Sequence, residues 1–229
     1  MKSAESVSIF DGVCENQMKY VLYIFSLLAL AGCSTDERIP LGNTTHSVAP
    51  SKVVLIPLDG FDLRDVNEIA DYIEKQHKVH VSTYTHMGKN PAMFNAEKQQ
   101  YLSEEIAQAA WRVLHDNGDA DLSKAVIVLT RDDINTGDFR FRYFFSNHFE
   151  DLKLSVISTA RIDPINYGLP ADHDLKIRRL EKLVNKSLGL HLYGYKNGTD
   201  KSSVMYGPIM GVEDLDSVGD WYGATQPQF

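Results

Sequence analysis

The chain has 229 residues, of which 43% are hydrophobic and 24% are charged. This length and this share of apolar residues are sufficient for one domain with a buried core. The formal net charge is -8 and the sequence contains no long basic run, which excludes nucleic acid as an expected partner.

The N-terminal segment has the pattern of a bacterial lipoprotein signal. An apolar run at 20–31 is too short to span a bilayer and is typical of a signal peptide. It ends in Leu-Ala-Gly followed by Cys33, which resembles the lipobox whose cysteine is acylated after cleavage. We therefore expect 1–17 to be an upstream extension from a misassigned start, 18–32 to be the signal peptide, and Cys33 to be lipidated.

This signal also predicts a location in the cell. With a serine after Cys33, the lipid anchor is expected in the outer membrane of a bacterial envelope, with the protein facing the periplasm. The alternative is an ordinary signal peptide with an incidental cysteine. Residues 33–51 are rich in Pro, Gly, Asn and Thr and are predicted to be a tether. The folded domain is expected at 52–229.

Within this domain, strand and helix patterns alternate. Strands are predicted at 52–57, 77–85, 125–129, 139–145 and 154–160, and helices at 63–76, 97–115, 172–188 and 214–222. Asp62 is the expected N-cap of the first helix. This order indicates an α/β (α+β) fold, in which a mixed twisted sheet packs on helices.

The helix predicted at 172–188 carries the strongest apolar pattern. Four of its residues recur at helical spacing and are expected to be buried: Leu180, Leu183, Val184 and Leu188. Gly189 is predicted to end the helix as a C-terminal cap. A polar loop at 195–203 follows and leads to Met205.

This order of helix, glycine, loop and methionine resembles the zinc-binding core of the metzincin proteases. Their motif is H-E-x-x-H-x-x-G-x-x-H, followed by a methionine turn. With the motif glycine placed on Gly189, the two helical histidines fall on Lys182 and Lys186. The general-base glutamate falls on Leu183 and the third histidine on Leu192. The resemblance therefore implies a zincin-like fold with a degenerate zinc motif.

Over 52–219 the chain more specifically resembles the archaemetzincins. The segments that carry this resemblance occur in the family's order: KVVLIPLDGF at 52–61, NAEKQQYLSEEI at 95–106, VIVLTRDDI at 126–134, SVISTARI at 155–162, LGL at 188–190 and SVM at 203–205. The resemblance implies a central active-site helix beneath a cleft. It also implies a second zinc bound by cysteines, but Tyr193 and Ser203 occupy those positions here.

The residues at the motif positions cannot perform zinc chemistry. Zinc binds lone pairs of imidazole, thiolate or carboxylate groups, whereas a lysine ammonium only donates hydrogen bonds and repels a cation. A leucine at the base position cannot activate water. We therefore expect no catalytic residue, no metal ligand and no cofactor.

The preferred hypothesis is a pseudoenzyme. In it, an envelope lipoprotein with an archaemetzincin-like metallopeptidase fold is catalytically inactive and binds a peptide or protein in the former active-site cleft. His191, Met205 and Tyr206 are the candidate cleft residues. One alternative hypothesis is a structural or assembly lipoprotein whose likeness to a protease is accidental.

Another alternative hypothesis is an active zinc-dependent peptidase with relocated ligands. Zinc would then be the cofactor, bound for instance by His191, His173 and an acid from Asp214 or Asp216.

The two lysines at ligand positions have a further expected role. In the pseudoenzyme, Lys182 or Lys186 is expected where the zinc ion would be, paired with an acid from 213–216. The alternative is that both lysines reach solvent from an ordinary amphipathic helix.

Overall fold

The structure is a computed structural model that describes residues 52–137 and 141–223. The upstream extension, the signal peptide, Cys33 and the tether lie outside the described residues, as does part of the strand predicted at 139–145. Within the described ranges, no helix combines the length and the apolar character needed to cross a membrane.

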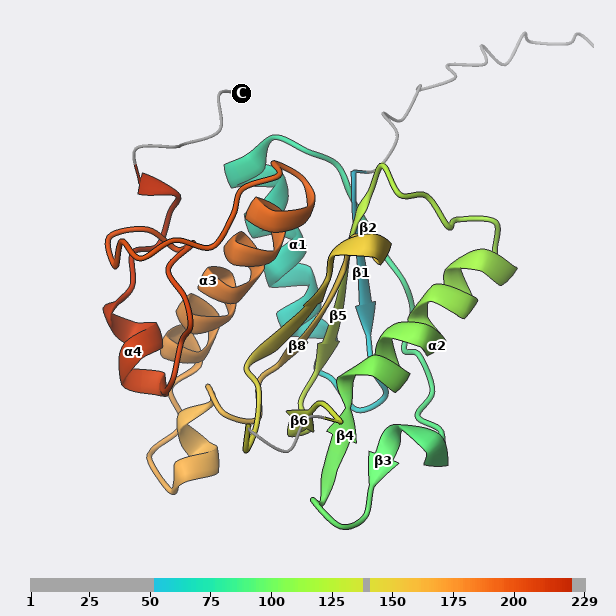
Figure 1. Cartoon of the computed structure of the whole chain (residues 1–229), viewed down its shortest axis with the longest axis horizontal. Coiled ribbons are helices and arrows are strands. Elements are labelled where there is room, and N and C mark those ends of the chain that lie inside the picture. Colours follow the sequence, from blue (N-terminus) through green and yellow to red (C-terminus); the bar gives the residue numbers. More distant parts are fainter. Residues whose placement is uncertain (1–51, 138–140, 224–229) are drawn as a thin grey trace, which may run out of the picture. The chain divides into compact units, whose positions relative to one another are not determined.

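A five-stranded mixed sheet forms the centre of the domain (Figure 1). Its strand order is β2-β1-β5-β8-β7, and only β7 runs antiparallel to its neighbour. The bounds are β1 Val53–Pro57, β2 Val81–Thr83, β5 Ala125–Thr130, β7 Ser146–Phe149 and β8 Leu154–Ser158. A smaller sheet joins β3 Phe94–Asn95, β4 Gln100–Leu102 and β6 Ile134–Asn135.

Helices cover both faces of the large sheet. Helix α1, Leu63–His77, and helix α3, His173–His191, pack on one face, and α2, Ser103–Asp116, packs on the other (Figure 1). Helix α4, Val212–Ser217, lies against α3. Short 3-10 turns occupy Pro91–Met93, Glu150–Leu152 and Pro164–Tyr167. The α/β class with a central long helix is confirmed.

Alternation along the strands divides the interior into two cores, because successive side chains point to opposite faces. In β1, Val53 and Leu55 face α1 and α3, whereas Val54 and Ile56 face α2. The four apolar residues of α3 belong to the first core and are almost fully buried: Leu180, Leu183, Val184 and Leu188. The predicted inner face of the central helix is therefore confirmed.

Both long helices on this face begin at a capping aspartate. The side chain of Asp62 accepts a hydrogen bond from Arg64 N at 2.9 Å, and Asp172 accepts one from Leu175 N at 2.9 Å. Each cap satisfies one of the main-chain N–H groups that a helix start leaves without a partner. The predicted start of α1 is thereby confirmed, and α3 begins one residue after its predicted start, with Asp172 as the cap.

Several predicted boundaries were wrong. The strand predicted at 77–85 is limited to Val81–Thr83. It begins late because α1 continues to His77 and Lys78 then takes a left-handed conformation that ends the helix. The helix predicted from residue 97 begins at Ser103, because the Asn95 side chain accepts from two main-chain N–H groups and forms a turn. The following β4 then pairs with β3 and β6. The last helix is also shorter than predicted and ends at Ser217.

The edge of the large sheet also differs from the prediction. The strand paired with β8 is Ser146–Phe149, and of the more apolar residues before it Phe145 contributes one main-chain hydrogen bond, from Ser158 N at 2.9 Å. Of the described part of 139–145, Phe144 forms only an isolated bridge with Ile134. Pairing of the 146–149 segment with β8 thus sets the edge of the sheet.

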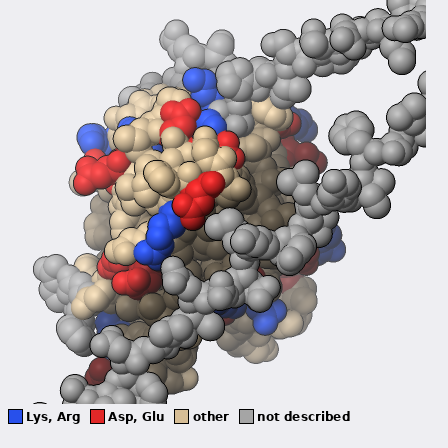
Figure 2. All heavy atoms as spheres, turned by 90° about the vertical axis from the view of Figure 1, so that its right-hand side faces the viewer, with Lys and Arg blue, Asp and Glu red and all other residues tan. Residues whose placement is uncertain are grey.

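The face drawn in Figure 2 carries both signs of charge. Lysine and arginine side chains there are interspersed with aspartate and glutamate, and no extended basic patch is visible among the coloured residues. Such a mixed surface lacks the single-sign field that steers a polyanion to its partner.

Candidate ligand-binding cleft

A cavity of about 800 Å³ opens beside the central helix. Its lining comes from 141–148, from Leu183 and Lys186 on α3, from Asn197 and from 207–210. Strand β7 contributes to this lining and is the last strand of its sheet, so β8 is its one strand partner among the described residues. The cavity thus brings together an edge strand and the helix that the family resemblance places beneath a cleft.

The described part of the lining is largely apolar and contains no aspartate or glutamate. Its apolar members are Phe141, Tyr143, Phe144, Phe145, Leu183, Pro208, Ile209 and Met210. Its polar members are Arg142, Ser146, Asn147, His148, Lys186 and Asn197. Among the described residues, the cavity therefore combines an apolar body with polar groups, and its charged members are basic.

Lys186 is the most unusual of these polar residues because it is 7% exposed and none of the acids that the structure describes is its partner. Within the described part of the chain, its one hydrogen-bond acceptor is the carbonyl oxygen of Tyr206, 2.6 Å from Nζ. Burial disfavours the charged ammonium and lowers the pKa of Lys186 to about 8. The side chain therefore remains mainly protonated at neutral pH, but loses its proton more readily than an exposed lysine.

Next to Lys186, two imidazoles share one serine hydroxyl. Ser155 Oγ lies 2.7 Å from His148 Nδ1 and 2.9 Å from His191 Nε2. Burial lowers the pKa of His148 to about 3, with further contributions from His191 and Lys186. Burial also lowers the pKa of His191 to about 4, with a contribution from Lys153. Both imidazoles are consequently neutral at pH 7.

The four degenerate motif positions have different surroundings. Leu183 and Lys186 line the cavity, whereas Lys182 and Leu192 do not. Lys182 Nζ donates to carbonyl oxygens at the C-terminal end of α4, the shortest bond being to Val218 O at 2.8 Å. It also lies 3.3 Å from Asp220. Leu192 packs against the apolar core on the α1 and α3 side of the sheet.

Two of the predicted partner acids in 213–216 bind other cations. Asp216 receives two hydrogen bonds from the guanidinium of Arg179, at 2.7 and 2.6 Å. Asp214 pairs with Lys201 at 2.7 Å. Because neither acid pairs with Lys182 or Lys186, the predicted carboxylate partner was wrong. The prediction that both lysines reach solvent was also wrong, because Lys186 is buried.

Gly189 does not end the central helix, which continues to His191. A Cβ at Gly189 would lie 2.8 Å from Tyr222 Cε1 and still closer to the sulfur of Met205. The glycine therefore permits the methionine segment and Tyr222 to approach the helix, and the predicted C-terminal cap was wrong. This contact places Met205 beneath α3.

The candidate cleft residues named from the sequence lie behind the cavity wall. His191, Met205 and Tyr206 do not contribute to the lining, although the carbonyl of Tyr206 holds Lys186. The aromatic run at 141–145 and the segment 207–210 supply much of the lining instead. The high aromatic content of 141–145 was a usable signal in the sequence for a binding surface. The segment 207–210 had no such signal.

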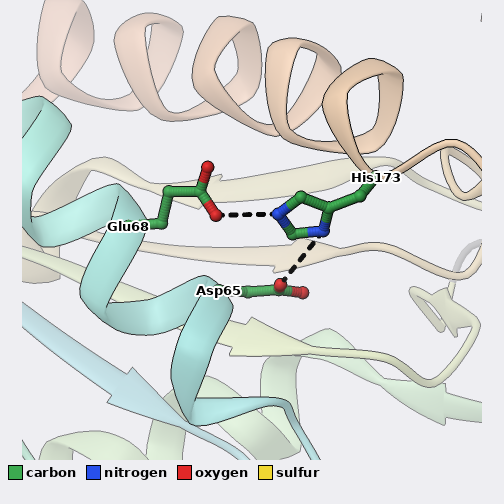
Figure 3. A group of neighbouring side chains, drawn as sticks. All are labelled: Asp65, Glu68 and His173. Carbon is green, nitrogen blue, oxygen red and sulfur yellow. Dashed lines mark hydrogen bonds and ion pairs between the residues drawn. The ribbon is translucent and has the colours of Figure 1, made fainter.

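A second group of side chains joins α1 to α3, as Figure 3 shows. His173 Nε2 lies 2.8 Å from Glu68, and His173 Nδ1 lies 3.8 Å from Asp65. These three residues are close enough for a metal ion. However, Lys176 Nζ already lies 2.6 Å from Asp65, and Arg64 contacts His173 at 3.1 Å. Lys176 neutralises Asp65, and Arg64 adds a positive charge beside His173, so the group forms a salt-bridge cluster between the helices.

The relocated zinc site proposed from the sequence does not form around His173 and His191. These residues are the first and last of α3, 18 positions apart. At 1.5 Å per residue, they are separated by about 27 Å along the helix axis. One ion cannot bind both, since zinc–nitrogen bonds are about 2.0–2.1 Å long.

The cleft residues also do not fit the zinc site of a metzincin. Lys186 donates its hydrogen bond to a carbonyl, and the side chains of Leu183 and Leu192 offer no lone pair. His148 and His191 are neutral, but each uses a ring nitrogen on the shared Ser155 hydroxyl. The donor set that zinc requires is thus not assembled at this place.

Comparison with known proteins found similarity only at the level of structure. No family model and no curated protein sequence matches the chain. A zinc-dependent peptidase from Methanocorpusculum labreanum has a TM-score of 0.64 and 16% identity, over 75% of this chain and 96% of that one.

Two archaemetzincin structures are similar to the same extent. The protein from Archaeoglobus fulgidus, in complex with malonate, has a TM-score of 0.60 and 21% identity, over 75% of this chain and 95% of that one. The protein from Methanopyrus kandleri has a TM-score of 0.60 and 18% identity, over 77% of this chain and 93% of that one. The chain therefore has an archaemetzincin-like fold, and the resemblance drawn from the sequence is confirmed at the level of the fold.

Proposed function

We propose that this protein is an envelope lipoprotein that has the fold of a zinc-dependent peptidase without its chemistry, and that it binds a peptide or protein segment in the cleft. The observation that carries this proposal is the identity of two lining residues. Lys186 and Leu183 occupy the positions that the family resemblance gives to a zinc ligand and to the general base. A cavity is retained, while the groups needed for hydrolysis are replaced.

The form of the cavity supports a peptide as the ligand. Its volume of about 800 Å³ lies in the range usual for ligand sites, roughly 300–1,000 Å³. It adjoins β7, an edge strand whose outer main-chain groups can pair with an extended segment, as in β-strand addition. The apolar lining would receive the side chains of that segment.

The first test is metal content together with peptidase activity. Protein purified without chelators is expected to contain far less than one zinc per chain and to leave a mixture of peptides uncleaved, because the cleft lacks a zinc donor set. Elemental analysis and mass spectrometry of the peptide mixture measure both quantities. Near-stoichiometric zinc with peptide cleavage would contradict the proposal.

Two variants identify the origin of any zinc that is found. Loss of zinc in His173→Ala would assign the ion to the cluster with Asp65 and Glu68, outside the cleft. Loss of zinc in His191→Ala, with retention in His173→Ala, would assign it to the cleft and favour an active peptidase with relocated ligands. The same pair of variants can be assayed for peptide cleavage.

The second test concerns the lipid anchor. In a bacterial host, the wild-type chain is expected to incorporate labelled palmitate and to sediment with outer membranes. Cys33→Ala is expected to abolish the label, because it removes the acylated thiol. Cys14→Ala is the matched control and should retain the label, since Cys14 lies upstream of the predicted cleavage point. An unlabelled, soluble wild-type protein would refute this location.

A further inference from the structure

We propose that the ligand of the cleft carries a carboxylate that pairs with the ammonium of Lys186, while apolar groups of the ligand occupy the aromatic part of the lining. This inference rests on the proposed function, since it names the chemistry of the ligand in the same cavity. It would make the lysine that replaces a zinc ligand the anchor for an anion.

The ammonium of Lys186 has unused hydrogen-bonding capacity. A lysine Nζ has three donors, and one acceptor, Tyr206 O, lies within reach among the residues that the structure describes. The residue is 7% exposed, so few of the missing hydrogen bonds can be made to bulk water. A buried charge of this kind is costly unless it is paired, and an anion in the cavity would pair it.

The surroundings of Lys186 select for a negative rather than a positive group. Among the residues that the structure describes, the lining contains no acid, and its other charged or titratable members are Arg142, Tyr143 and His148. His148 is neutral because burial lowers its pKa to about 3, and His191, which shares the Ser155 hydroxyl with it, is neutral for the same reason. The charged side chains of the described lining are therefore the cations Lys186 and Arg142.

The main chain leaves room beside the ammonium. A Cβ at Gly207 would lie 3.0 Å from Lys186 Nζ and 3.6 Å from Asn197 Oδ1. Any larger residue would therefore crowd the ammonium, whereas glycine leaves it open toward the cavity. The amide of Asn197 lies next to the same place, and a side-chain amide can supply an additional donor to a carboxylate.

The test uses pairs of peptides that differ only in a carboxylate. One pair is acetyl-Ala-Leu-Phe-Leu as the free acid and as the C-terminal amide. The other pair is acetyl-Leu-Glu-Phe-amide and acetyl-Leu-Gln-Phe-amide, which places the carboxylate on a side chain. Binding to the full folded domain at pH 7 is measured by calorimetry for the wild type, Lys186→Met, Lys186→Arg and the control Lys75→Met, whose lysine is exposed on α1.

In at least one pair, the acid is expected to bind about tenfold or more tightly than the amide, because a hydrogen bond to a charged group contributes about 1.5–3 kcal/mol. The pair that shows the preference identifies the source of the carboxylate. The preference should disappear in Lys186→Met, remain in Lys186→Arg and Lys75→Met, and decrease in the wild type above pH 8 as Lys186 loses its proton. Thermal unfolding of each variant verifies that it is folded.

The outcomes separate this inference from the proposed function. Equal binding of acid and amide by the wild type, or an unchanged preference in folded Lys186→Met, would overturn the carboxylate proposal and leave peptide binding intact. Binding of none of the four peptides, but of 4-phenylbutyrate in a Lys186-dependent manner, would support the carboxylate and overturn the peptide. Binding of no probe at all would overturn both.

Discussion

Leu188→Ala is expected to lower the free energy of unfolding by about 2–5 kcal/mol, the range for truncating a fully buried leucine. Leu188 is 0% exposed and belongs to the core between the sheet and the pair α1 and α3. The substitution removes apolar contacts and leaves a cavity, since the neighbouring side chains of α3 and the sheet collapse only in part. Urea denaturation followed by circular dichroism measures the change.

The matched control is the same substitution at an exposed leucine. Leu122 is 54% exposed, so Leu122→Ala should change the free energy of unfolding by no more than about 0.5 kcal/mol. If Leu188→Ala had an effect as small as this control, the packing of α3 described above would be incorrect.

The fold should also lose stability between pH 6.5 and pH 5. The pKa of His148 is lowered to about 3 and that of His191 to about 4, whereas an unfolded histidine titrates near 6.5. The pKa of His77 is lowered as well, by burial. Below pH 6.5 the unfolded chain therefore binds protons that the folded chain does not bind, and falling pH favours unfolding.

The size of this effect follows from the linkage between proton binding and folding. At pH 5, a histidine with a folded pKa of about 4 contributes a loss of roughly 2 kcal/mol relative to pH 7. The loss continues until the pH reaches the folded pKa values. Burial raises the pKa of the Glu181 carboxyl, and this group acts in the opposite direction, because the folded state then binds its proton more readily than the unfolded chain as the pH falls. Chemical denaturation at pH 7, 6 and 5 measures the slope.

Variants show whether these histidines are the cause. His191→Gln keeps a polar group that can reach Ser155 but cannot be protonated, so its loss of stability between pH 7 and pH 5 should be about 2 kcal/mol smaller than in the wild type. His115→Gln is the control, because the His115 side chain is 77% exposed. A wild-type stability that is flat between pH 7 and pH 5 would refute the assignment of buried neutral imidazoles.

Local patterns in the sequence determined most of the secondary structure correctly. The apolar period of 172–188 identified the inner face of α3, because helix geometry places residues three or four apart on one side. Asp62 identified the start of α1, since an aspartate cap acts within three residues along the chain. The family resemblance predicted the archaemetzincin-like fold, and the solved structures confirm it.

Contacts between distant segments determine which residues line the cleft. The aromatic run 141–145, Lys186 and 207–210 are far apart in sequence, and only the folded domain brings them to one cavity. Gly189 illustrates the same limit: its sequence context favours a helix cap, but the close approach of Met205 and Tyr222 gives it a packing role inside the helix.

The charge state of the cleft also required the tertiary structure. The family resemblance placed Lys186 at a zinc-ligand position, and the sequence predicted a nearby acid as its partner. In the folded chain those acids pair with Arg179 and Lys201, and Lys186 is left with the carbonyl of Tyr206. Hydrogen bonds and desolvation depend on distances of a few ångströms between segments, and no local pattern encodes those distances.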